Sequence, residues 1–80
     1  MDMVSVLKKA LSEASEIPVE SLQDDAALEQ QGISSFQLVT AYVWLENELD
    51  ISFQGDQMPY STTVTIAELA KVVEEIRVGA

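Results

Sequence analysis

Apolar residues recur every three or four positions in three separate segments of this chain, and this spacing is the strongest constraint on its fold. Because a helix brings such positions onto one face, each segment is predicted to be a helix with one buried stripe. The three stripes are Met3, Leu7, Ala10, Leu11 and Ala14; Leu38, Ala41, Tyr42, Leu45 and Leu49; and Ile66, Leu69, Val72, Val73 and Ile76. Eighty residues make one small domain, so we predict a single all-α domain over 1–80.

Local signals mark the ends of the first helix. Asp2 is positioned to cap its start. Pro18 biases the preceding residue away from helical angles, so the helix is predicted to stop near Glu16. The connection from Ile17 to Ile33 is polar with spaced apolar anchors. Because that is long for a connection in a compact domain, we expect an ordered loop pinned across the helices, with one short helical turn.

The second helix has a clear starting signal. Ser34 and Gln37 have the spacing of a capping box, in which the serine hydroxyl accepts from an amide and the glutamine reaches back. Gly32 permits an unusual backbone angle just before it. No proline or glycine interrupts the run from Ser35 to Asp50, which is predicted to be helical throughout.

The stretch after the second helix is less regular. Gly55 and a proline break it, and a short third helix is predicted near Met58 to Thr62. Thr65 and Glu68 repeat the capping-box spacing and open the last helix, which Gly79 closes. Amphipathic helices joined in this way predict a small helical bundle.

The absence of two residue types removes several kinds of chemistry. The chain contains no cysteine and no histidine. Disulfides, thiolate zinc sites and thiol catalysis need cysteine, and Ser-His pairs and His metal sites need histidine. We therefore predict no catalytic residues, no metal site and a protein that is not an enzyme.

The charge balance excludes further classes. Fourteen acidic residues against four basic ones give a formal net charge of −10. Four scattered basic residues cannot follow a nucleic-acid backbone, whereas the acidic field favours partner proteins with basic patches. No stretch approaches the roughly 20 apolar residues of a membrane span, and the N-terminus does not read as a secretory signal. We expect a cytoplasmic monomer that binds neither nucleic acid nor membrane.

The candidate site lies at the start of the second helix. A serine in the first turn of a helix exposes its hydroxyl beside unpaired amides and the positive end of the helix dipole, which suits an attached phosphate. Ser34 and Ser35 both lie there. The simpler interpretation is that both serines only cap the helix.

The residues around these serines resemble a known motif. Gly32, Ser35 and Phe36 match the phosphopantetheine attachment motif of the acyl carrier and peptidyl carrier protein family, with glycine three residues before the serine and a large apolar residue after it. The runs 45–50 and 65–70 also resemble the family. The resemblance spans essentially the whole chain, and it implies a four-helix bundle of acyl carrier protein type.

The resemblance also implies a cofactor and partners. A phosphopantetheinyl transferase would attach 4'-phosphopantetheine from coenzyme A to Ser35, and the arm's thiol would carry cargo as a thioester. Ser34 replaces the family's usual Asp or His, and it stays open as a second attachment candidate. The other expected partners are an acyl- or aminoacyl-loading enzyme and an acyltransferase, ketosynthase or condensation enzyme.

A second apolar line runs along a flank of the second helix. Phe36, Val39 and Val43 are predicted to bind partners, with Glu46 as a charge at the rim. The alternative is that the three apolar residues belong to the core. Trp44 and Tyr42 are interpreted as packing residues rather than a ligand cage.

Several functions remain open from the sequence. The leading hypothesis is a freestanding carrier in polyketide or nonribosomal peptide biosynthesis, because Gln37 and Thr40 stand where carriers of fatty acid synthesis commonly have carboxylates. The alternatives are an acyl carrier protein of fatty acid synthesis and an unmodified acidic helical interaction module. The initial methionine favours a discrete protein, although a domain excised from a larger synthase would look the same.

Overall fold

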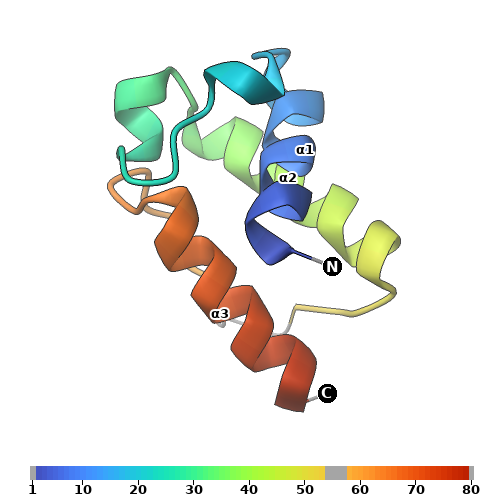
Figure 1. The fold of residues 1–80 in the computed structure, drawn as a ribbon. Coiled ribbons are helices and arrows are strands. Elements are labelled where there is room, and N and C mark those ends of the chain that lie inside the picture. Colours follow the sequence, from blue (N-terminus) through green and yellow to red (C-terminus); the bar gives the residue numbers. More distant parts are fainter. Residues whose placement is uncertain (1, 54–57, 80) are drawn as a thin grey trace.

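The computed structural model describes residues 2–53 and 58–79 of the chain (Figure 1). Over this part, the chain forms three α-helices and two 3-10 helices and no strand. The elements are, in order, α1 (Met3–Ser15), η1 (Val19–Ser21), η2 (Leu28–Gln31), α2 (Ser35–Leu49) and α3 (Ile66–Gly79). The predicted all-α architecture is confirmed, but the expected four-helix count is not.

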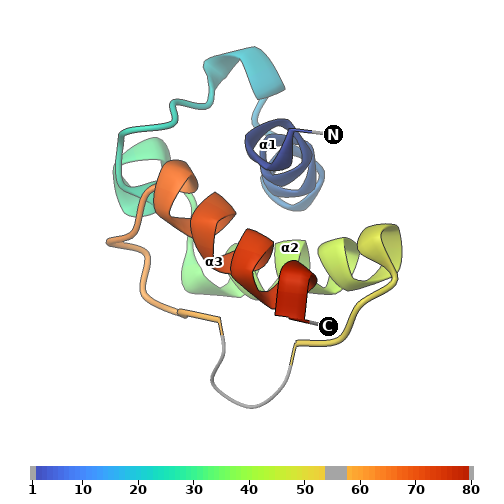
Figure 2. The ribbon, with the colours of Figure 1, turned by 60° about the horizontal axis from the view of Figure 1, so that its bottom comes forward.

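The core lies between the three α-helices, with α1 packed against both α2 and α3 (Figures 1 and 2). Each helix turns the stripe that its spacing predicts toward the core. Most of these side chains are buried, and the half-buried ones that pack against the core are Ala14, Leu49, Val72 and Ile76. The two connections contribute further anchors, namely Leu22, Leu28, Ile33 and Met58. In the described part of the chain the core contains no charged side chain. Apolar burial is therefore the main stabilising contribution in this small fold.

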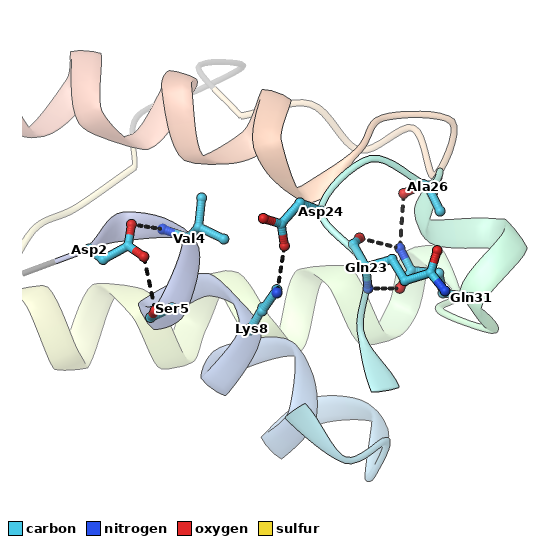
Figure 3. A network of polar contacts seen from close by, with 8 residues as sticks. All are labelled: Asp2, Val4, Ser5, Lys8, Gln23, Asp24, Ala26 and Gln31. Atoms are coloured by element: carbon cyan, nitrogen blue, oxygen red, sulfur yellow. Dashed lines mark hydrogen bonds and ion pairs between the residues drawn. The ribbon is translucent and has the colours of Figure 1, made fainter. Parts of the chain in front are cut away.

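The ends of α1 follow the predicted signals. The Asp2 carboxylate accepts hydrogen bonds from the Val4 amide at 3.3 Å and the Ser5 hydroxyl at 3.0 Å (Figure 3). Glu16 takes a left-handed conformation with φ 64°, and its amide donates to the Ser12 carbonyl. The helix therefore ends at Ser15, next to the predicted stop.

The connection between α1 and α2 is ordered by side-chain contacts, with two short 3-10 helices where one helical turn is predicted. Gln31 is the central tie (Figure 3): its amide nitrogen donates to the carbonyls of Gln23 at 3.0 Å and Ala26 at 2.9 Å, and its oxygen accepts from the Gln23 amide at 2.7 Å. Lys8 of α1 pairs with Asp24 at 2.5 Å. The predicted pinning of this loop is confirmed.

The same connection is also bonded to the entrance of α3, which lies beside it in both views of the ribbon (Figures 1 and 2). The amide of Leu28 donates to the Val64 carbonyl at 2.9 Å, and the amide of Glu29 donates to the Thr62 carbonyl at 2.9 Å. These backbone bonds hold η2, and with it the approach to α2, in a fixed place.

The short helix predicted near Met58 to Thr62 is wrong, because this stretch contains a bend and the start of a turn instead. The carbonyl of Pro59 accepts from the Tyr42 hydroxyl, and that of Thr62 accepts from the Glu29 amide. The Thr63 amide donates to the Ser61 hydroxyl at 3.3 Å rather than to a carbonyl of a preceding turn. Gly55, the other predicted break, lies outside the described residues.

Candidate functional site at the start of α2

Two side chains cap the N-terminus of α2. The Ser34 hydroxyl accepts from the Gln37 amide at 3.2 Å, and the Gln37 side-chain oxygen accepts from the Ser34 amide at 2.9 Å. This is the Ser-x-x-Gln arrangement that the sequence predicts. The Ser34 hydroxyl therefore has a structural task already.

Ser35 is the first residue of α2, and its side chain is exposed. Within residues 2–53 and 58–79, its hydroxyl makes no recorded hydrogen bond, and no acceptor is recorded for its amide or that of Phe36. Unpaired amides at a helix start carry partial positive charge and point toward an incoming anion. A phosphodiester on the Ser35 oxygen fits this position. The group must be reachable from solvent, and its negative charge is stabilised by the positive potential of the unpaired amides.

Gly32 directs the chain into this position. It ends η2 in a left-handed conformation with φ 83°, where residues with a Cβ are strained. The next residue, Ile33, is buried, and its amide donates to the Leu28 carbonyl at 3.1 Å. The chain is therefore anchored one residue before the Ser34 cap, which fixes where the two serines emerge.

The second apolar line on α2 faces solvent. The exposed fractions are 81% for Phe36, 43% for Val39 and 52% for Val43. The alternative that these three residues belong to the core is therefore wrong. Phe36 follows Ser35 directly, so the line begins beside the candidate attachment oxygen.

Glu46 has a contact that the sequence did not predict. It is half-buried, and its carboxylate accepts from the Phe53 amide at 2.8 Å. It therefore ties the chain leaving α2 back onto the helix. No local spacing signals such a bond, because the partner is a backbone amide in an irregular segment.

Tyr42, on the buried face of α2, contacts the segment that follows this helix. Its ring packs edge-on against Phe53 and Tyr60, with centroid separations of 5.9 and 5.8 Å. Its hydroxyl donates to the Pro59 carbonyl. Burial, with a smaller effect from Tyr60, raises the pKa of the Tyr42 hydroxyl well above its ordinary value. The predicted packing role of Tyr42 is confirmed, and Trp44 likewise packs against the core.

The described ranges lack a metal site and a membrane-spanning helix. No group of three or more acidic, His or Cys side chains there could hold a metal ion. None of the helices described is long and apolar enough to cross a membrane.

Comparison with known proteins identifies the family. A family model described as a phosphopantetheine attachment site matches residues 5–73, which is most of the chain. The chain therefore belongs to this family, whose members carry 4'-phosphopantetheine covalently on a serine. No curated protein and no solved structure is a significant match.

Family membership bears on the chemistry that such a domain supplies. Carrier domains of this family are not catalytic themselves, and they interact with modifying and synthetic enzymes, including phosphopantetheinyl transferase. When bound, the group supplies a thiol that holds acyl cargo as a thioester. Around the start of α2, the chain's own residues present the exposed Ser35 side chain and an exposed apolar side chain, Phe36.

Proposed function

We propose that this protein is a carrier that holds acyl, aminoacyl or polyketide intermediates on a phosphopantetheine arm attached to Ser35. The observation that carries the proposal is the exposed Ser35 hydroxyl at the start of α2, which has no recorded hydrogen-bond partner in the described part of the chain. A transferase must reach this oxygen, and attachment there breaks no hydrogen bond found within residues 2–53 and 58–79.

The choice of Ser35 over Ser34 rests on the capping box. Adding a phosphodiester to the Ser34 oxygen would disturb its bond to the Gln37 amide. Losing a cap of this kind costs about 1 kcal/mol. Modification of Ser35 leaves the cap intact, and the cap keeps the first turn of α2 ordered around the attachment point.

The apolar line of Phe36, Val39 and Val43 is the proposed docking surface for the loading and synthetic enzymes. Large exposed apolar side chains beside the attachment point are suited to filling pockets in a partner. Glu46 is the proposed rim charge, because it is half-exposed and, among the described residues, only one of its oxygens accepts a hydrogen bond. Its bond to Phe53 limits how far it can move toward a partner.

The proposed pathway class is polyketide or nonribosomal peptide biosynthesis. Between Ser35 and Leu45, α2 has no acidic residue, and Gln37 and Thr40 are neutral. The surface next to the attachment point is therefore apolar rather than charged, which favours partners that recognise it by packing. Fatty acid synthesis is the alternative within the same class.

Intact mass spectrometry tests the proposal. After incubation with coenzyme A and a transferase of broad specificity, we expect a mass gain of one phosphopantetheine that disappears in Ser35→Ala. Ser34→Ala is the matched control and should still be modified. Absence of any gain with a transferase that modifies a reference carrier would favour the unmodified acidic interaction module.

A further inference from the structure

We infer that a groove between the start of α1 and the second half of α2 is a docking site for a basic segment of a partner protein, one that presents an arginine or lysine next to an apolar side chain. The groove has a volume of about 260 Å³. It is lined by Asp2, Ser5, Val6, Lys9, Trp44 and Glu48. This inference goes beyond the carrier function, because none of these residues takes part in attachment of the arm.

The groove lies on a different side of α2 from the apolar line. Successive residues of an α-helix are about 100° apart, so Trp44 and Val43 face different directions. Trp44 and Glu48, four residues apart, share one flank. Trp44 is nine positions after Ser35, which corresponds to about 13 Å along the helix axis. A segment in the groove therefore leaves both Ser35 and its docking line accessible.

The apolar wall of the groove suits an alkyl chain and a guanidinium or ammonium group. Trp44 and Val6 are half-buried, so each keeps part of its side chain at the surface. A tryptophan ring attracts a cation that stacks on its face, and it is the strongest aromatic partner for this contact. Tryptophan is also enriched among the residues that dominate binding energy at interfaces.

The charges in the groove favour a cation over an anion. Glu48 is exposed, and no ion pair or hydrogen bond of its carboxylate is recorded within 2–53 and 58–79. The Asp2 carboxylate already accepts from Val4 and Ser5 (Figure 3), so Glu48 has the greater free acceptor capacity. The positive charge of Lys9 offsets one of the two negative charges of Asp2 and Glu48, so the groove lining keeps a net negative charge.

The net charge of the whole chain indicates which kind of partner segment can bind in the groove. With a formal net charge of −10, a second copy of this protein is repelled, and so is an acidic peptide. A basic segment is attracted over long range and guided into the groove. Docking in the groove can hold a partner enzyme near the carrier while the arm and the apolar line stay free for other enzymes.

Trp44 provides a direct readout, because it is the only tryptophan in the chain. The probes are short synthetic peptides without aromatic residues: one with two arginines flanking two leucines, and one in which glutamines replace the arginines. For the unmodified full chain at low salt, we expect the arginine peptide to change Trp44 fluorescence saturably and to bind about tenfold more tightly than the glutamine peptide. Added salt should weaken its binding.

Matched variants separate specific docking from general attraction to an acidic protein. Glu48→Gln should weaken binding of the arginine peptide about threefold, whereas Glu75→Gln, which removes the same charge on α3, should leave it unchanged. Ser35→Ala should bind as the wild type does, so this test does not depend on the arm. Equal weakening by the two glutamate variants, absence of saturation, or NMR shifts centred on Phe36 and Val43 would overturn the inference.

Discussion

The two apolar sides of α2 have similar side chains and different surroundings. One side buries Leu38 and Leu45 completely in the core, whereas the other leaves Phe36 and Val43 more than half exposed. Both sides repeat at helical spacing, so periodicity alone does not distinguish them. The difference shows that one face of the helix contributes to stability, whereas the other stays exposed and is the proposed docking surface.

The largest expected effect is on the buried side. Leu38→Ala should lower the free energy of unfolding by about 2 to 5 kcal/mol, because it removes apolar contacts and leaves a cavity. In a domain this small, that is a large part of the total stability. Denaturant unfolding followed by circular dichroism measures the loss. Phe36→Ala is the control and should change the same quantity by less than about 0.5 kcal/mol.

Substitutions on the exposed side should act on partner enzymes instead. Phe36→Ala or Val43→Asp should reduce kcat/KM for loading by a partner enzyme about tenfold, which corresponds to about 1.4 kcal/mol of lost contact energy. The helical signal and the unfolding midpoint should be retained. If these variants melt like Leu38→Ala, the exposed side is structural and the proposed docking surface is wrong.

A substitution at Tyr42, on the buried side, should have a smaller effect on the free energy of unfolding than Leu38→Ala. Tyr42→Phe removes the hydroxyl that donates to the Pro59 carbonyl, so it should cost about 1 kcal/mol near neutral pH. The fold favours the neutral hydroxyl, because burial raises its pKa above the ordinary value of 10.0. The contribution of the neutral Tyr42 hydroxyl to the free energy of unfolding is therefore fully present below about pH 10. It is lost as the pH rises from there toward the higher folded-state pKa, because the unfolded chain loses the proton first.

Unfolding measured at about pH 8 and about pH 11 checks this prediction. The stability of the wild type relative to Tyr42→Phe should decrease by about 1 kcal/mol between the two conditions. An unchanged difference between the two proteins would mean that the Tyr42 hydroxyl is not held in its neutral form by the fold.

The sequence predicted the features that depend on local chemistry. The three buried stripes, the Asp2 cap and the left-handed Gly32 all follow from spacing or from one residue's conformational preference. The pinned connection before α2 was also expected, since Leu22 and Leu28 supply apolar anchors. Helical periodicity and capping are encoded over a few neighbouring residues, which makes them readable.

Contacts between distant segments could not be predicted in this way. The Tyr42 bond to Pro59 spans seventeen positions, and the Glu46 bond to Phe53 reaches an irregular segment. The Glu29 bond to Thr62 depends on how η2 meets the entrance of α3. These pairings form only when the helices pack. They accompany the irregular path of the chain at Met58 to Thr62, which the local sequence did not predict.

The most direct test of the attachment site is backbone fragmentation of the modified wild-type protein in the mass spectrometer. Cleavage of the chain between Ser34 and Ser35 gives two fragments, and only one can retain the added phosphopantetheine. We predict that the fragment beginning at Ser35 carries the whole added mass and that the fragment ending at Ser34 has its unmodified mass. Added mass on the fragment that ends at Ser34 would contradict the assignment.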